Sequence, residues 1–297
     1  MSSDSSLKLR VHSALLFVQI TFGGFSVFGK YVVGSVPPLA VAGIRVLGAA
    51  PLFLLLAAQQ GRAVPPWGEL PRLALLGLFG VCMNQILFIV GLSYTTATNA
   101  AILITSIPLF TLTAAALLRI EKLKAQTVQG VALAVAGALI VLDPSHFSLG
   151  GSVSFGNLLI LLNCVSYSLF LVLAGRVLLR LPPITVIAWS YILGGIPVLA
   201  VSAPTLAAWS PSSTPALAWA GLLYIVLFAT VVNYALNTWA IRHTSSSVVA
   251  AYTTLQPLVA ATLASVFLGE SIGWQETAGF VLIAGGLLRV TAPKPKR

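Results

Sequence analysis

The stretch GLSYTTATNAAILITSIPLFTLTAAALLRIEKLKAQTVQGVALAVAGALIVL runs from Gly91 to Leu142 and reappears without a gap as AIRHTSSSVVAAYTTLQPLVAATLASVFLGESIGWQETAGFVLIAGGLLRVT, from Ala240 to Thr291. One constant step superposes shared residues: Thr95 on Thr244, Thr105 on Thr254, Pro108 on Pro257, Glu121 on Glu270, Gly130 on Gly279 and Gly137 on Gly286. By the same step Asn84 falls on Asn233, and a slightly different step pairs Phe22 with Tyr167 and Pro37-Pro38 with Pro182-Pro183. The chain is therefore two copies of one unit, a first half at residues 1–145 and a second half at residues 146–297.

The composition places this duplicated unit in a lipid bilayer. Of the 297 residues, 58% are hydrophobic and only 7% are charged, and the mean hydropathy is +1.00. A soluble domain carries roughly 25% charged residues. Most of the surface must therefore face lipid, and we expect an all-α integral membrane protein.

Ten apolar runs are long enough to cross a hydrocarbon core of about 30 Å as helices. They lie near residues 13–34, 38–59, 71–93, 97–118, 124–142, 154–177, 184–203, 216–239, 246–268 and 274–291. The first run is longer than the apolar region of a typical signal peptide, so we expect it to be retained. Each half therefore contributes five spans, and the chain crosses the membrane many times.

Positive charge alternates from loop to loop. Lys and Arg occur before the first run, after every second run and behind the last run, whereas residues 34–38, 95–98, 143–151, 203–215 and 269–275 hold none. The positive-inside rule then puts both termini in the cytoplasm, as an even number of spans requires, and favours a bacterial inner membrane. The net charge of +10 is explained by this topology, so we expect no nucleic-acid partner.

An odd number of spans per half means that the second half enters the bilayer from the opposite side. The loop after the fourth run holds Arg119, Lys122 and Lys124, whereas its counterpart after the ninth run keeps Glu270 and has no cation. We therefore expect two inverted five-helix repeats, related by a pseudo-two-fold axis in the membrane plane. Such halves can exchange conformations, so that a site between them opens to one side of the membrane at a time.

These features resemble the EamA-type branch of the drug/metabolite transporter superfamily. The residues that carry the resemblance are the pair Phe22-Gly23 in the first run, the segment from Pro37 to Arg45, a proline within runs four and nine, Glu121 and Glu270. The resemblance implies export of small metabolites, commonly amino acids, through a cavity built by spans 1–4 and 6–9. Within the superfamily, the chain is most similar to the aromatic amino acid exporters.

Polar side chains at membrane depth are the first candidates for a binding site, because each costs free energy unless it is paired or faces a cavity. They are Gln19, Asn84, Asn99, Asn163, Asn233, Asn237 and Gln256. Asn84 and Asn233 are repeat mates near the middle of their spans, and an amide there can accept from an ammonium and donate to a carboxylate. Interhelical hydrogen bonding is the alternative for each single residue. Together, the seven favour a polar-lined cavity.

Aromatic residues form the second group of candidates. Phe22, Phe25 and Phe28 recur at three-residue spacing in the first run, and Tyr167 with Phe170 matches them in the sixth. The eighth and ninth runs add Tyr234, Trp239 and Tyr252. Rings around a cavity suit hydrophobic or aromatic solutes and can hold an amino group by cation–π contact. Packing against lipid, or an interfacial aromatic belt, explains the same pattern.

Prolines and one arginine complete the candidates. Pro108 and Pro257 lie near the centres of runs four and nine, where each removes a backbone donor and frees carbonyls one turn earlier. The repeat favours a hinge or gate there, and a plain kink is the alternative.

Arg45 lies about two turns inside the second run, so a protein partner or a substrate carboxylate is expected for it. Its repeat mate is Ser190, which makes this charge asymmetric.

The sequence thus predicts a secondary transporter for small amphipathic metabolites, most specifically hydrophobic or aromatic amino acids. Two alternatives are a nucleotide-sugar or organic-anion exchanger of the same fold, which would need more cations in its cavity, and a polytopic lipid-modifying enzyme. We expect no cofactor and no metal, because paired acidic residues and metal-ligand spacings are missing from the sequence. No carboxylate lies in mid-membrane, which favours facilitated diffusion, exchange or proton coupling through another group. We expect a monomer or a weak homodimer.

Overall fold

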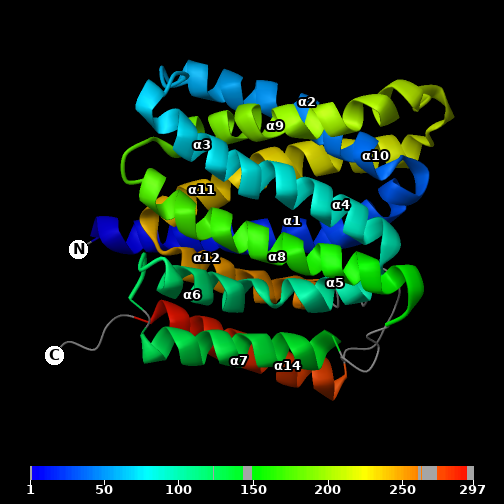
Figure 1. Cartoon of the computed structure of the whole chain (residues 1–297). Coiled ribbons are helices and arrows are strands. Elements are labelled where there is room, and N and C mark those ends of the chain that lie inside the picture. The colour runs from blue at the N-terminus through cyan, green and yellow to red at the C-terminus, as the bar shows by residue number, and fades with distance from the viewer. Residues whose placement is uncertain (1, 123, 143–148, 260–261, 263–272, 293–297) are drawn as a thin grey trace.

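The computed structural model describes residues 2–122, 124–142, 149–259, 262 and 273–292, and these residues form helices and turns with no strand among them (Figure 1). The helices are α1 (Ser2–Ser35), α2 (Pro38–Gln59), η1 (Trp67–Glu69), α3 (Leu70–Gly77), η2 (Leu78–Met83), α4 (Asn84–Tyr94), α5 (Ala97–Ile104), α6 (Ile107–Leu117), α7 (Ala125–Leu142), α8 (Gly151–Val177), α9 (Pro183–Ala208), η4 (Pro211–Ser213), α10 (Ala216–Val226), η5 (Leu227–Val232), α11 (Asn233–His243), α12 (Ser246–Ala251), η6 (Tyr252–Leu255) and α14 (Trp274–Thr291). The all-helical prediction is confirmed for the described residues.

Seven of the helical segments are long and apolar enough to cross a membrane. They are Ser6–Ser35, Pro38–Gln59, Trp67–Tyr94, Ala97–Leu117, Gly151–Val177, Pro183–Ala208 and Ala216–His243. Two expected spans, the fifth and the tenth, correspond to the shorter apolar helices Ala125–Ile140 and Thr277–Thr291. The expected ninth span begins with α12 and η6 and continues into residues that the structure does not describe. The number of ten spans therefore stays a prediction.

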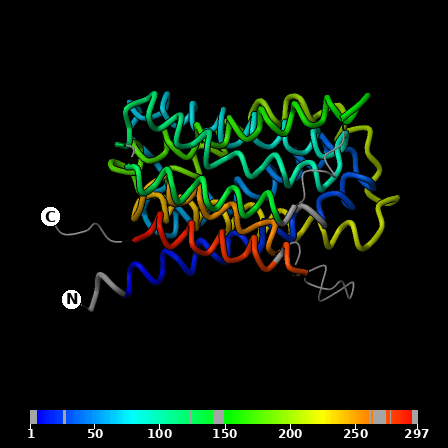
Figure 2. Tube along the Cα trace, turned by 90° about the horizontal axis from the view of Figure 1, so that it is seen from below, coloured from blue at the N-terminus to red at the C-terminus, as the bar shows by residue number. Residues whose placement is uncertain are grey.

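The helices run roughly parallel or antiparallel to one another, and the start of α1 and the end of α14 lie at the same end of the bundle (Figure 1). Helix α2 packs on α9, α4 on α8, and α7 on α14. The view from below shows α14 alongside the rest of the bundle, in red (Figure 2). Many large apolar side chains stay on the outside, such as Leu55 at 54% exposure and Phe280 at 58%. An apolar exterior of this kind suits lipid rather than water.

The fourth span is broken near its middle. Helix α5 ends at Ile104, the chain turns at Thr105 and Ser106, and α6 restarts with Pro108 in its first turn. Proline is tolerated there because its missing N–H would have no intrahelical acceptor. The Thr105 hydroxyl donates to the carbonyl of Ile102 at 2.6 Å, so it satisfies a backbone group that the break leaves free.

The ninth span departs from regular helix at the corresponding place. Helix α12 changes into the 3-10 turn η6 before Pro257, which is buried. The Thr254 hydroxyl donates to the carbonyl of Ala251 at 2.7 Å, as its repeat mate does in the fourth span. The hinge role of Pro108 and Pro257 remains a prediction, with matching helix irregularities beside both.

Helices α7 and α14 meet along glycines. A Cβ atom on Gly130 would lie 2.7 Å from the carbonyl oxygen of Gly286, and a Cβ on Gly137 would lie 2.7 Å from that of Gly279. Backbones approach so closely only where both helices lack side chains. This contact joins the two halves of one chain.

The first prediction uses two adjacent glycines of α14. A Cβ on Gly286 would lie 2.5 Å from the Gly130 carbonyl oxygen, whereas one on Gly285 would meet only the Leu133 side chain, at 3.6 Å. Overpacking costs about 1–3 kcal/mol, so Gly286→Ala should lower the unfolding midpoint of the detergent-purified protein. The control Gly285→Ala should leave the midpoint unchanged or raise it, because alanine favours helix. Equal midpoints for the two variants would contradict the close contact between α7 and α14.

Candidate functional site

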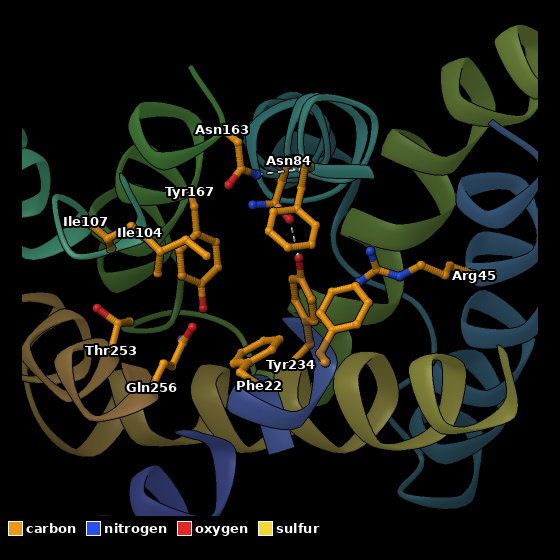
Figure 3. A pocket seen from close by; sticks show the side chains of 12 residues that line it. Phe22, Arg45, Asn84, Ile104, Ile107, Asn163, Tyr167, Tyr234, Thr253 and Gln256 are labelled. Carbon is orange, nitrogen blue, oxygen red and sulfur yellow. Dashed lines mark hydrogen bonds between the residues drawn. The ribbon is translucent and has the colours of Figure 1, made fainter. Parts of the chain in front are cut away.

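A small cavity opens between side chains from both halves of the chain (Figure 3). Its lining comprises Phe22, Phe25, Arg45, Asn84, Phe88, Ile104 and Ile107 from the first half and Asn163, Tyr167, Tyr234, Thr253 and Gln256 from the second. The cavity volume is about 60 Å³, room for a few water molecules. A larger solute would require the cavity to widen.

Two π-helical segments shape the spans on which the cavity is built. Segment η2 (Leu78–Met83) ends directly before Asn84, and η5 (Leu227–Val232) ends directly before Asn233. The step that relates the two copies superposes these segments end to end. Because π-turns are rare and frequently occur at functional sites, their presence at matching positions marks this level of the bundle. The amino-acid sequence gave no indication of these π-helical segments.

A hydrogen-bonded group of three side chains ties α4, α8 and α11 together at the cavity wall (Figure 3). The Tyr234 hydroxyl lies 2.8 Å from Asn84 Oδ1 and 2.9 Å from the carbonyl oxygen of Gly80, and Asn163 Nδ2 donates to the Asn84 carbonyl at 2.8 Å. For Asn84 Nδ2 and Asn163 Oδ1 no hydrogen-bond partner is found within the described part of the chain. The wall thus offers a solute one amide donor and one amide acceptor.

Aromatic rings form much of the remaining wall. The rings of Phe25 and Phe88 lie 5.2 Å apart between centroids, and Phe22 and Tyr167 add further surface. The Tyr167 hydroxyl accepts from Asn237 Nδ2 at 2.9 Å, which fixes this ring. Phe28, the third member of the expected stripe, is 47% exposed and lies outside the cavity.

Arg45 reaches the cavity from α2 and is only 2% exposed. Its Nε donates to Thr230 Oγ1 at 3.1 Å, and its Cζ lies 5.2 Å from the centroid of the Phe25 ring. The ion pairs found among the described residues join Glu69 to Arg72 and to Arg180, so Arg45 has no carboxylate partner there. A cation at membrane depth costs about 2.5–3.5 kcal/mol on insertion scales.

Several predicted site residues do not line the cavity. Gln19 accepts from Gln256 Nε2 at 2.9 Å and so positions a residue that does line it. Asn237 supports Tyr167 in the same way. The Tyr252 hydroxyl lies 2.7 Å from His12 Nδ1, and Asn99 donates to Asn157 Oδ1 at 3.0 Å.

The repeat mates Asn84 and Asn233 differ in their surroundings. Asn84 lines the cavity, whereas Asn233 is fully buried and accepts from the Thr21 hydroxyl at 2.6 Å. Asn233 therefore makes an interhelical hydrogen bond and does not line the cavity.

Four lining residues escaped sequence reasoning: Phe88, Ile104, Ile107 and Thr253. An apolar side chain at a cavity wall has the same sequence pattern as one that faces lipid. Thr253 gave one usable signal, because it adjoins Thr254 at the expected irregularity before Pro257.

Glu121 makes a second contact between the halves. Its Oε1 accepts from the backbone N–H of Ser246 at 2.9 Å and from the Ser246 hydroxyl, and its Oε2 accepts from the Ser247 hydroxyl at 2.5 Å. We call this group the Glu121 cap, because it caps the N-terminus of α12, where a negative charge is favourable. Helix α6 ends and α12 begins at the end of the bundle that carries both termini (Figure 1). The repeat mate Glu270 lies outside the described residues.

The chain is an apolar helical bundle with a small aromatic and amide-lined cavity, and its relatives include proteins described as transporters. An uncharacterized transporter of Archaeoglobus fulgidus is 28% identical over 287 residues, which cover 95% of this chain and 98% of the relative. The uncharacterized inner membrane transporter YedA of Escherichia coli is 27% identical over 288 residues, covering 96% and 92%. Protein WALLS ARE THIN 1 of Arabidopsis thaliana is 28% identical over 323 aligned positions, covering 94% and 82%.

The family itself is shown by a match over nearly the whole chain. The sequence model of the EamA-like transporter family matches residues 10–143 and, a second time, residues 154–292. The chain belongs to the EamA-like transporter family. A known crystal structure superposes with a TM-score of 0.74 at 18% identity and covers 96% of this chain and 97% of its own; at that identity the likeness concerns the fold alone.

The second prediction tests the cavity with two neighbouring threonines. Thr253 is 4% exposed and lines the cavity, whereas Thr254 is fully buried and does not line it. In a background without Cys82 and Cys164, Thr253→Cys should react with methyl methanethiosulfonate about tenfold faster than Thr254→Cys, because a buried thiol reacts only through local opening. Mass spectrometry of the purified protein measures both rates. Equal rates would show that the described cavity does not admit small solutes.

Proposed function

We propose that the protein is a secondary carrier that exports small amphipathic metabolites, specifically hydrophobic or aromatic amino acids, across the cytoplasmic membrane by alternating access. The observation that carries this proposal is the cavity that the two halves build together, with rings for an apolar body and amide groups for a polar head. Carriers commonly hold their solute at such an interface near the bilayer midplane.

Reciprocal contacts support an inverted relation between the halves. Gly130 meets Gly286 while Gly137 meets Gly279, so each glycine meets the repeat mate of the other, as a two-fold relation requires. Matching N-caps add to this: Thr96 accepts from the N–H of Asn99 and Ser245 from that of Val248. The double match of the family's sequence model fits the same arrangement.

The Glu121 cap supplies a contact that alternating access would have to make and break. With the termini in the cytoplasm, the cap closes the cytoplasmic end of the interface between the halves in this conformation. It holds a carboxylate with three donors, and these bonds are lost when that end opens. If the two conformations are to have similar free energies, a contact at the opposite end of the bundle must form when the Glu121 cap is lost.

The organic-anion exchanger remains the second candidate because Arg45 is buried in the cavity. A nucleotide sugar carries more negative charge than one guanidinium balances, and Arg45 is the one cation among the described lining residues. A lipid-modifying enzyme is the weaker alternative, since the relatives are described as transporters.

The third prediction concerns transport itself. Proteoliposomes of the purified protein should take up radiolabelled phenylalanine in a saturable manner without an ion gradient. Tyr234→Phe should reduce uptake about tenfold, because it removes the one hydroxyl hydrogen within reach of Asn84 Oδ1 and the Gly80 carbonyl, at a cost of about 1–3 kcal/mol. The control Tyr94→Phe changes a half-exposed ring and should transport like the wild type. Uptake of an acidic metabolite but no uptake of phenylalanine would transfer the assignment to the anion exchanger.

The fourth prediction concerns the Glu121 cap. Glu121→Ala and Ser247→Ala should each lower stability and turnover, and a double-mutant cycle should show a coupling of about 1–2 kcal/mol, as charged hydrogen bonds allow. Glu69→Ala combined with Ser247→Ala is the matched control, because Glu69 bonds elsewhere, and its effects should add. Unfolding in mixed micelles and uptake rates give the two readouts. If Glu121→Ala transports at the wild-type rate, the Glu121 cap has a structural role only, and its part in transport is contradicted.

A further inference from the structure

Arg45 is a permanent charge in the cavity, and no counter-charge lies among the described residues that line it. The guanidinium of arginine keeps its proton in proteins. Figure 3 shows the side chain extending from α2 with its planar end directed into the cavity. Of the described residues that line this cavity, Arg45 is the one charged member.

The protein positions this guanidinium but binds only part of it. Thr230 donates its own hydroxyl hydrogen to the carbonyl of Ile225 at 2.7 Å, so its oxygen is left to accept from Arg45 Nε at 3.1 Å. The π-helical segment η5 places Thr230 there. For the Nη donors no hydrogen-bond partner is found among the described residues. These donors form the planar fork that binds a carboxylate in bidentate geometry.

Neither of the two acidic side chains that the structure describes, Glu69 and Glu121, offers the missing charge. Glu69 is bound to Arg72 and Arg180, and Glu121 belongs to the Glu121 cap. The side chains of Asp4, Asp143, Glu270 and Glu276 lie outside the described residues, and all four stand at the ends of apolar runs in the sequence. The solute is therefore the natural source of a carboxylate for Arg45.

Charge balance decides what else the solute carries. With Arg45 present, a bound monocarboxylate makes the cavity neutral, whereas a zwitterionic amino acid leaves a net positive charge in a site of low dielectric. No carboxylate among the described lining residues can compensate an ammonium. The groups that remain to contact an ammonium are amide oxygens and ring faces, and both can also contact a solute that carries no positive charge.

We propose that Arg45 selects solutes by their carboxylate, and that the α-ammonium group is dispensable, so that the solute class is apolar monocarboxylates, with or without an amino group. This inference rests on the proposed function only in taking the cavity as the solute site. Thr230 acts as a positioning residue for the guanidinium.

The test compares three ligands of one shape on the detergent-purified full chain, by isothermal titration and ligand-induced shifts in unfolding temperature. The ligands are phenylalanine, 3-phenylpropionate, which lacks the amino group, and 2-phenylethylamine, which lacks the carboxylate. Wild-type protein should bind 3-phenylpropionate at least as tightly as phenylalanine and should not bind 2-phenylethylamine. Equilibrium binding avoids the passive leak of uncharged forms through a bilayer.

Arg45→Gln should weaken binding of both carboxylates about tenfold or more, the usual result of removing one partner of a buried charged pair. The ligand-free variant should be at least as stable as the wild type, because an unpaired buried cation has been removed. Thr230→Val keeps the charge and should weaken carboxylate binding by less, and Thr230→Ser should restore it. Arg62→Gln, in an exposed loop, is the matched control.

The outcomes separate this inference from the proposed function. Phenylalanine bound equally by wild type and Arg45→Gln, or 2-phenylethylamine bound as well as 3-phenylpropionate, would overturn the inference and leave an amino acid carrier in place. Binding of 3-phenylpropionate alone would overturn the amino acid assignment; it would support selection by the carboxylate and restrict the class to monocarboxylates without an amino group. Failure of all three ligands to bind would contradict both.

Discussion

A bilayer offers neither hydrogen bonds nor counter-ions to the groups buried in it, and this constraint governs every irregular feature of the structure. The broken fourth span is tolerated because hydroxyls such as that of Thr105 bond the carbonyls that the break frees. The π-helical segments place polar side chains that bond across the bundle, as Tyr234 bonds the carbonyl of Gly80. Where the protein supplies no partner within the described residues, as for the Nη donors of Arg45, the constraint points to a ligand.

Features that occur in both halves suit the conformational change, whereas a feature that occurs in one half suits recognition of the solute. Paired features recur in both halves: the π-helical segments η2 and η5, the helix irregularities beside Pro108 and Pro257, and the glycines that join α7 to α14. If the two halves exchange conformations, both need the same structural features, and such features are expected to occur in each half. Arg45 has no such counterpart, because Ser190 stands at its repeat position and lies buried. A charge that only one half supplies, in a cavity built by both halves, is suited to holding a solute in one orientation.

Much of this architecture follows from the sequence because apolar runs, loop charges and internal repeats are strong signals. Seven of the predicted runs correspond to helices long enough to span. Asn84 and Asn163 were singled out because polar atoms at membrane depth are costly, and Tyr167 and Tyr234 because aromatic rings around a cavity suit apolar solutes. The same signal could not separate Asn84 from Asn233, since a cavity and an interhelical bond satisfy an amide equally well. It also could not find Phe88, Ile104 or Ile107, whose apolar side chains match those that face lipid. The π-helical register has no known residue signature, so only coordinates reveal it.

Alternating access around the cavity is the central claim, and the distance across the Glu121 cap tests it most directly. Spin labels at Lys122→Cys and His243→Cys, in a background without Cys82 and Cys164, would report the separation of α6 from the start of α12 in lipid nanodiscs. Alternating access predicts two populations of distances, one short and one long, whose ratio shifts when 3-phenylpropionate or phenylalanine is added. A single distance that no solute changes would contradict it.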